Sequence, residues 1–372
     1  MAPTPLQQLS DHGQSVWIDF LSRPFVRDGD LEALVHEGVN GVTSNPTIFQ
    51  AAIAEGDAYD DQLREVLKEE RDPKEVFLAL AVEDIRGACD ILRPQWDEAG
   101  DNARDGWVSL EVDPRLAHDT EGTIEEAKRL HAMVDRPNLF IKIPATPEGL
   151  PAIEETIAAG IPVNVTLIFS LERHREVAEA YLRGIERLAE SGGTDLSRIA
   201  SVASFFVSRV DTEADKRLDA IGGHDELKGT LAIANAKLAY QSYKEIFAGE
   251  RWDALKAKGA TAQRCLWAST STKNPEYRDV LYVEELIGRE TVDTMPRETV
   301  EAFQDHGRVA DTLEDDVEAA RKVLAAFAEA GIDYDDVVET LEREGVEKFA
   351  KSFQQLFADV EAKRDSLVAA TS

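Results

Sequence analysis

Eight short apolar or alternating segments recur along this chain, and stretches with helical periodicity separate each segment from the next. The segments are residues 15–20, 41–46, 107–112, 139–144, 163–169, 199–207, 264–270 and 291–296. Strands that alternate with helices predict a parallel sheet, because parallel neighbours need a long crossover connection. Eight such repeats favour a closed barrel over an open doubly wound sheet. The sequence therefore predicts an α/β fold, a (β/α)8 TIM barrel with additional helices in insertions and at the C-terminus.

The length of the chain, 372 residues, is compatible with one barrel that carries insertions. Charged, helix-like insertions lie at about 51–106 and 210–262, and a helical tail runs from about 313 to the end. No Pro-, Gly- or Ser-rich linker separates these parts. We therefore expect one barrel domain over residues 1–372.

The charge balance restricts the partners of this protein. The chain has 72 acidic and 41 basic side chains, for a formal net charge of -31, and such a surface repels a nucleic-acid backbone. No segment approaches the ~18 consecutive apolar residues of a membrane span, and the first residues lack a leader pattern. The two cysteines, Cys89 and Cys265, cannot build a disulfide framework. We expect a cytoplasmic protein without nucleic-acid or membrane partners, either a monomer or a homodimer.

Polar side chains gather on one face of the predicted strands. Successive side chains of a strand point to opposite faces, so alternation divides each segment into two sets. The polar sets contain Asp19, Glu111, Lys142, Asn164 and Thr166, opposite sets of Val, Ile, Leu and Phe. We expect the apolar sets to pack beneath the helices and the polar sets to line the barrel interior. Barrel enzymes keep their chemistry at the C-terminal ends of the strands, where these residues lie.

A lysine and two carboxylates at this end of a barrel can perform carbonyl chemistry. Desolvation disfavours an ammonium group, so a lysine amine inside a barrel is a candidate nucleophile toward a carbonyl carbon. In this interpretation Lys142 forms an imine, and Asp19 and Glu111 move the protons. The alternative is a buried polar network whose members only satisfy one another. The seven histidines show no metal-binding spacing, and no phosphate- or dinucleotide-binding glycine motif occurs, so neither metal nor cofactor is expected.

Three longer segments resemble the transaldolase family, especially its longer bacterial branch. They are GVTSNPTIF at 41–49, FIKIPATPEGLPAIEE at 140–155 and GIPVNVTLIFS at 160–170. The resemblance extends over most of the chain in the same order. It implies an enzyme that transfers a dihydroxyacetone unit from sedoheptulose 7-phosphate to glyceraldehyde 3-phosphate. Its partners would be sugar phosphates, and its pathway the pentose phosphate pathway.

The resemblance also implies catalytic roles. Lys142 would form the Schiff base with the ketose donor, and Asp19 would act as acid and base at the substrate hydroxyl during cleavage. Glu111 and Thr166 would hold the water that shuttles protons during imine formation and release.

Further residues are implied to bind the donor. Asn45 and Asn164 would fix donor hydroxyls and the dihydroxyacetone unit, and Ser204 would contact the donor fragment. Phe206 resembles a phenylalanine of the family's transferring members, which favours transfer over simple aldol cleavage.

Phosphate binding is implied for residues that follow two later strands. Arg209 resembles the family's phosphate-binding arginine, whose fork of donors suits a phosphate, and Ser269 would assist it. The family places a second arginine where this chain has Ser271. Lys273 is a candidate replacement, although a lysine binds phosphate as a point charge.

Two other functions remain compatible with the sequence. One is a fructose 6-phosphate aldolase or a transaldolase-like enzyme of secondary metabolism. The other is a non-catalytic barrel, which the joint presence of Lys142, Asp19, Glu111 and Thr166 disfavours.

Overall fold

The eight predicted strands form a closed parallel barrel. The computed structural model of the chain describes residues 3–54, 56–100, 104–192 and 195–371. Its strands pair in sequence order, and β8 closes the barrel by pairing with β1. The strands are β1 (Gln14–Ile18), β2 (Gly41–Val42), β3 (Trp107–Glu111), β4 (Leu139–Pro144), β5 (Val163–Ile168), β6 (Ser201–Phe206), β7 (Arg264–Ala268) and β8 (Thr291–Met295). Seven strands lie inside their predicted segments and β1 begins one residue before its segment, which confirms the (β/α)8 barrel.

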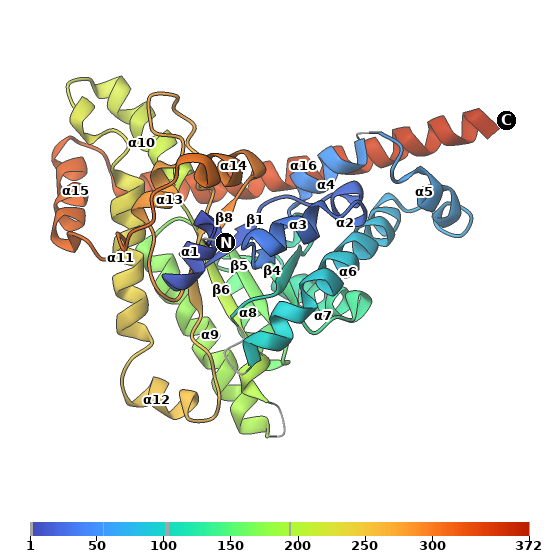
Figure 1. The fold of residues 1–372 in the computed structure, drawn as a ribbon, viewed down its shortest axis with the longest axis horizontal. Helices are drawn as coiled ribbons and strands as arrows, with labels where there is room; N and C mark the ends of the chain where they lie inside the picture. Colours follow the sequence, from blue (N-terminus) through green and yellow to red (C-terminus); the bar gives the residue numbers. More distant parts are fainter. Residues whose placement is uncertain (1–2, 55, 101–103, 193–194, 372) are drawn as a thin grey trace.

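Helices surround this barrel and form the two insertions and the tail (Figure 1). In the first half of the chain they are α1 (Pro5–Asp11), α2 (Arg23–Arg27), α3 (Asp30–Glu37), α4 (Pro46–Ala54), α5 (Asp60–Val66), α6 (Pro73–Ala99), η2 (Pro114–Leu116), α7 (Thr120–Val134), α8 (Gly149–Ala158) and α9 (Leu171–Ser191). In the second half they are η3 (Leu196–Arg198), α10 (Ser208–Ile221), η4 (Asp225–Leu227), α11 (Leu231–Ile246), α12 (Glu250–Lys256), α13 (Leu281–Glu285), α14 (Arg297–His306), α15 (Val317–Glu329) and α16 (Tyr334–Thr371).

The second strand is shorter than the sequence predicted. The predicted segment extends to residue 46, but β2 ends at Val42 and α4 begins at Pro46. Proline lacks the N–H that strand pairing needs, and its fixed φ suits the first turn of a helix. The Asn45 side chain caps this helix, because its Oδ1 accepts hydrogen bonds from the backbone N–H groups of Thr47 and Ile48 at 3.0 and 3.1 Å.

The barrel interior is aromatic below the level of Lys142. Trp107 stacks on Phe140 with ring centroids 4.2 Å apart, and Trp17 lies 5.8 Å from Phe140. These rings share the alternating positions of the polar sets, so the inward-facing set also contains large aromatic side chains. Gly41 makes room for them, since a Cβ there would lie 2.6 Å from the Trp17 indole. Glu111 and Lys142 follow Trp107 and Phe140 along β3 and β4, so they lie above these rings.

The helical tail crosses the C-terminal mouth of the barrel. Figure 1 shows α16 running past α4 and beyond α5 to the C-terminus, and α16 packs against α4, α5, α6, α10 and β5. Arg217 of α10 forms an ion pair at 2.5 Å with Asp336, which lies in the first turn of α16. Further along, Gln50 of α4 donates to the carboxylate of Asp359 at 2.6 Å. The tail is therefore a lid element on the barrel mouth.

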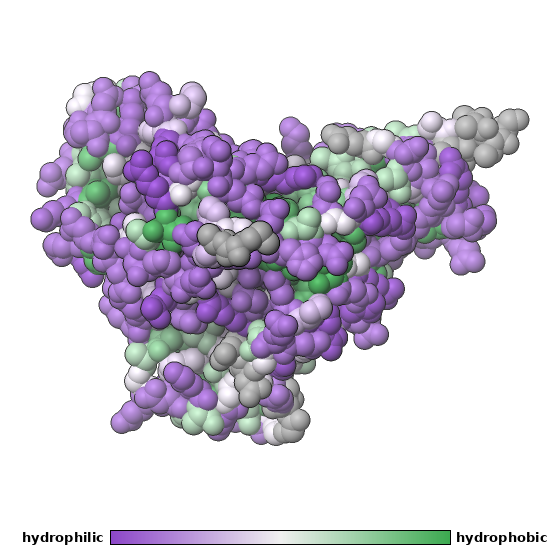
Figure 2. Space-filling model, viewed as in Figure 1, coloured by the Kyte–Doolittle hydropathy of each residue, from purple (hydrophilic) through white to green (hydrophobic). Residues whose placement is uncertain are grey.

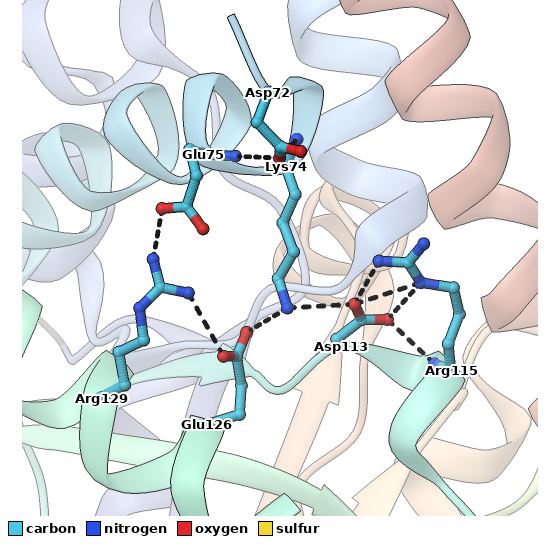
Figure 3. A network of polar contacts seen from close by, with 7 residues as sticks. All are labelled: Asp72, Lys74, Glu75, Asp113, Arg115, Glu126 and Arg129. Atoms are coloured by element: carbon cyan, nitrogen blue, oxygen red, sulfur yellow. Dashed lines mark hydrogen bonds and ion pairs between the residues drawn. The ribbon is translucent and has the colours of Figure 1, made fainter. Parts of the chain in front are cut away.

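A network of ion pairs and hydrogen bonds lies just after the end of β3 (Figure 3). Asp113 accepts from Arg115 at 2.6 Å and pairs with Lys74 at 3.1 Å, and Lys74 also pairs with Glu126 at 2.9 Å. Burial opposes ionisation of Asp113, but the bonds from Arg115 and Lys74 hold its pKa below the ordinary value. The Arg115 guanidinium in turn lies 5.1 Å from the ring of Phe357 on α16. The network thereby joins α6, α7 and η2 to α16.

The visible surface of the protein is mainly polar. Hydrophilic residues cover most of the face that Figure 2 shows. None of the helices in the described ranges is long and apolar enough to cross a membrane.

Candidate active site

Lys142 lies in the upper layer of the barrel interior, beside a carboxylate. The parallel register aligns Glu111 of β3, Lys142 of β4 and Asn164 of β5 on neighbouring strands. Lys142 is only 5% exposed. Its Nζ lies 3.3 Å from Glu111 Oε2 and donates a hydrogen bond to the Ser44 carbonyl oxygen at 3.4 Å. A buried charge needs such a partner, and Glu111 provides it.

Two polar atoms beside Lys142 are left without partners. Glu111 Oε1 and the Thr166 hydroxyl have no hydrogen-bond partner among the described residues, whereas Glu111 Oε2 pairs with the Lys142 ammonium. Both residues are buried, with Glu111 8% exposed and Thr166 fully covered. Buried polar groups are normally satisfied, so unsatisfied ones mark a place built to contact something else. These atoms therefore belong to the candidate site.

The two carboxyl groups of the site hold protons more tightly than ordinary carboxyl groups. Burial raises the pKa of Glu111, while Lys142 opposes the increase and Asp19 adds to it. Asp19 follows the last residue of β1, and burial raises its pKa as well, against the opposing charges of Lys142 and Arg209. Carboxyl groups with raised pKa values can exchange protons with a substrate near neutral pH. The site thus combines an amine with two candidate proton carriers.

A cavity of about 320 Å³ opens above these residues at the mouth of the barrel. The predicted residues that line it are Asp19, Asn45, Lys142, Thr166, Ser204, Phe206, Arg209, Ser269 and Lys273. Glu111 and Asn164 lie just behind this lining. Asn164 Oδ1 accepts a hydrogen bond from Ser204 Oγ at 2.7 Å, and its Nδ2 donates to Ser109 Oγ at 3.0 Å. The structure therefore brings together all eleven residues predicted for the site.

Cationic groups lie on one side of this cavity. The Arg209 guanidinium lies 4.9 Å from the centre of the Phe206 ring. Burial lowers the pKa of Arg209, and the charges of Asp19 and Glu111 oppose that change. Lys273 Nζ donates to Ser271 Oγ at 2.7 Å.

Ser269 lies beside these cations and has an unusual backbone. Its φ is +61°, a left-handed conformation that is uncommon for residues other than glycine. Its Oγ lies 2.9 Å from Ser208 Oγ, and its carbonyl oxygen accepts from the Ser208 N–H at 3.0 Å. Strained backbone of this kind clusters at ligand sites. The loop after β7 is thereby fixed to the first turn of α10, which carries Arg209.

Several lining residues were not predicted from the sequence. They are Thr43, Thr47, Ile48, Leu266, Ala268, Thr294, Lys348 and Phe349. Phe349 of α16 is 4% exposed, and its ring centre lies 5.7 Å from both Lys142 Nζ and Arg209 Cζ. The apolar residues of the tail recur at helical spacing, which is typical of a helix that buries one face. That pattern did not identify the barrel mouth as the surface it covers.

A larger cavity, about 630 Å³, lies at the opposite end of the barrel. It is lined by Ser201 and Arg264 at the starts of β6 and β7, and by residues of α11 and α12. Barrel enzymes act at the other end, and this cavity lacks a lysine–carboxylate pair like that of Lys142. The described residues include no group of three or more His, Cys, Asp and Glu arranged to hold a metal ion.

Comparison with known proteins places the chain in a family. The sequence profile of the Transaldolase/Fructose-6-phosphate aldolase family matches residues 16–360. The chain belongs to this family. A protein named Transaldolase from Acidothermus cellulolyticus is 56% identical over 359 residues, 96% of each chain. The Transaldolase of Thermobifida fusca is 56% identical over 357 residues, 95% of this chain and 96% of the relative. The Transaldolase of Mycobacterium leprae is 50% identical over 367 residues, 97% of each chain.

The three segments that resemble the transaldolase family all border the cavity. Residues 41–49 form β2 and the start of α4, residues 140–155 form β4 and most of α8, and residues 160–170 contain β5. Each contributes lining side chains, such as Asn45, Lys142 and Thr166. Each of the segments behind the family resemblance therefore contributes residues to the candidate site.

Proposed function

We propose that this family member is a transaldolase of the non-oxidative pentose phosphate pathway. It transfers a dihydroxyacetone unit from sedoheptulose 7-phosphate to D-glyceraldehyde 3-phosphate and yields D-erythrose 4-phosphate and D-fructose 6-phosphate. The observation that carries this proposal is the position of Lys142. It lies at the floor of the cavity beside Glu111, and cationic residues line the same cavity.

The reaction begins with imine formation. The neutral amine of Lys142 attacks the C2 carbonyl carbon of the donor, and the carbinolamine loses water to give the protonated imine. Glu111 and Thr166 hold the water that carries these protons. Their buried, unsatisfied oxygen atoms beside Lys142 support this role.

Asp19 performs the proton transfer of carbon–carbon cleavage. It takes the proton from the C4 hydroxyl, the C3–C4 bond breaks, and its electron pair moves into the imine to give an enamine. The aldehyde product, erythrose 4-phosphate, then leaves. The enamine attacks the acceptor aldehyde, Asp19 returns its proton, and hydrolysis of the new imine frees Lys142. The raised pKa of Asp19 suits a group that must hold the proton between the two half-reactions.

Three polar residues bind the donor. Asn45 and Asn164 fix the hydroxyls and the dihydroxyacetone unit, and Ser204 contacts the donor fragment. Asn45 Oδ1 is engaged in capping α4, so its amide hydrogens are the groups that it offers to the sugar. Asn164 is held in one orientation by Ser109 and Ser204.

Arg209, Ser269 and Lys273 bind the phosphate group of the sugar. The donor and the acceptor each carry such a group. Arg209 offers a planar fork of donors, and Lys273 offers a point charge. These three residues line both the cavity and an outer hollow beside it, so a phosphate bound there leaves the carbonyl end of the sugar free to reach Lys142.

Phe206 favours transfer over aldol cleavage, because its apolar ring lines the cavity without offering a hydroxyl to position a water molecule. The family description includes fructose 6-phosphate aldolases, so the two activities must be distinguished. Product analysis of reactions with fructose 6-phosphate, with and without erythrose 4-phosphate as acceptor, makes the distinction. A transaldolase forms sedoheptulose 7-phosphate with the acceptor and little free dihydroxyacetone without it. Rapid release of dihydroxyacetone without an acceptor would contradict the proposal.

The setting of this activity is also proposed. We propose a cytoplasmic enzyme of one barrel domain over residues 1–372, a monomer or homodimer that acts without metal or cofactor. The charge of -31 supports the absence of nucleic-acid partners.

A further inference from the structure

The geometry points to Lys348 of α16 as a third cationic residue of the phosphate subsite, which makes the helical lid a determinant of specificity for phosphorylated sugars. This inference rests on the proposed function and assigns a substrate-binding role to a residue outside the barrel strands and their loops.

Lys348 lies where two hollows meet. The inner cavity of about 320 Å³ contains Lys142, and an outer hollow of about 780 Å³ lies between α10 and α16. The residues that line both hollows are Arg209, Ser269, Lys273 and Lys348. A sugar that reaches Lys142 with its carbonyl end leaves its phosphate at this boundary. Lys348 therefore lies at the same boundary between the two hollows as the three proposed phosphate ligands.

The three cations at this boundary have no carboxylate partner. No ion pair joins Arg209, Lys273 or Lys348 to an acidic residue within the described ranges, although many other lysines and arginines of this acidic chain are paired. The charge of Arg209, then partial burial and Lys273, lowers the pKa of Lys348. Three like charges held together repel one another, and a dianionic group between them relieves that repulsion.

The packing of α16 fixes Lys348 at this boundary. Gly345 brings the helix against β5, because a Cβ at this position would lie only 3.0 Å from Leu167 Cδ2. One turn later, Phe349 is buried over Lys142 and Arg209. Lys348 is the neighbour of this anchored phenylalanine, so its Cα position is determined while its ammonium stays exposed to incoming substrate.

This arrangement separates phosphate recognition from the chemistry. Lys348 lines the mouth, whereas imine formation and cleavage take place at Lys142 and Asp19. Loss of the Lys348 charge should therefore weaken binding of phosphorylated sugars and leave reactions of sugars without phosphate largely unchanged.

The test compares Lys348→Met with Lys351→Met. Lys351 is on the same helix and lines the outer hollow but not the inner cavity, so it controls for the loss of a positive charge near the mouth. The kcat/KM values are measured with glyceraldehyde 3-phosphate and with D-glyceraldehyde as acceptors of the same donor. The inhibition constant of inorganic phosphate is measured in parallel, and thermal unfolding verifies the fold of each variant.

Lys348→Met should lower kcat/KM for glyceraldehyde 3-phosphate by about tenfold, mainly through KM, the effect expected for one lost charge-assisted contact. It should change kcat/KM for D-glyceraldehyde by less than about twofold and weaken inhibition by phosphate, while Lys348→Arg restores both values. Lys351→Met should match the unmodified protein.

Unchanged discrimination between the two acceptors in Lys348→Met would overturn the inference, as would an equal loss with both acceptors. If the unmodified protein catalyses no transfer, the proposed function fails instead. Calorimetric titration with inorganic phosphate then decides the question alone: binding lost in Lys348→Met supports the subsite, and binding retained overturns it.

Discussion

Replacing Asp293 with asparagine should stabilise the protein more at pH 8 than at pH 5. Asp293 lies on the outer face of β8 and is completely buried. One carboxylate oxygen accepts from the Thr270 hydroxyl at 2.8 Å, and that single proton is also within reach of the Thr294 carbonyl oxygen at 2.9 Å. The second oxygen has no partner among the described residues. The ionised form is therefore poorly solvated, and asparagine has nearly the same shape without the charge.

The magnitude follows from the pKa. Burial raises the pKa of Asp293 to about 7, with the Thr270 bond opposing the change, whereas an aspartate in an unfolded chain has a pKa of about 3.9. The folded state therefore binds the proton more tightly. This contribution to stability is complete below about pH 4, falls as pH rises, and is lost above about pH 7. Between pH 5 and 7 the loss is about two pKa units at 1.36 kcal/mol each, or roughly 3 kcal/mol.

Guanidinium unfolding of the unmodified and Asp293→Asn proteins at pH 5, 6, 7 and 8 measures this difference. The difference between the free energies of unfolding, variant minus unmodified protein, should rise by roughly 3 kcal/mol from pH 5 to pH 8. Most of this rise should occur below pH 7. Asp253→Asn is the matched control, because Asp253 is exposed on α12 and its charge is solvated in both states.

A constant difference between the two proteins from pH 5 to pH 8 would refute the reasoning. It would mean that Asp293 is ionised throughout and that another group solvates its carboxylate. A difference that grows equally in Asp253→Asn would assign the effect to general charge repulsion instead.

Two further changes test the account of the site and of the fold. Phe206→Tyr should raise cleavage relative to transfer, because a hydroxyl there can position water beside the bound intermediate; an unchanged ratio in a coupled assay of both products would contradict this. In the unmodified protein the buried Arg23 guanidinium pairs with Asp84 at 2.8 Å. Asp84→Ala should lower the free energy of unfolding by about 3–5 kcal/mol, because it leaves this buried charge without its carboxylate partner. Denaturant unfolding measures the loss, and a change below about 1 kcal/mol would mean that Arg23 finds another partner.

The strands and the central part of the site could be predicted because they depend on local patterns. Alternation of polar and apolar residues determines which face a strand side chain occupies. Barrel closure then aligns equivalent positions of neighbouring strands. Glu111, Lys142 and Asn164 occupy such positions, and the parallel register places them side by side.

The depth of each residue inside the barrel could not be predicted in this way. Trp17, Trp107 and Phe140 have the same alternation as the polar residues but lie below them. Depth depends on the stagger between strands, which is a property of the closed barrel and not of any single segment. Alternation therefore predicted which side chains face inward, but not which of them reach the cavity.

The contribution of α16 also could not be predicted. The sequence predicted a helical tail, but the surface on which this helix docks depends on contacts with distant segments such as β5 and α4. Lys348 and Phe349 follow Lys142 by about two hundred residues, and no local pattern connects them. The cavity wall that they form exists only in the folded barrel.

The most direct test of the central claim is to trap the imine. The protein is incubated with fructose 6-phosphate and borohydride, which reduces an imine to a stable amine, and intact and peptide mass spectra are recorded. The account predicts an adduct of the size of dihydroxyacetone on the peptide that contains Lys142, and no adduct in folded Lys142→Ala. Active, folded protein without an adduct on Lys142 would contradict the account.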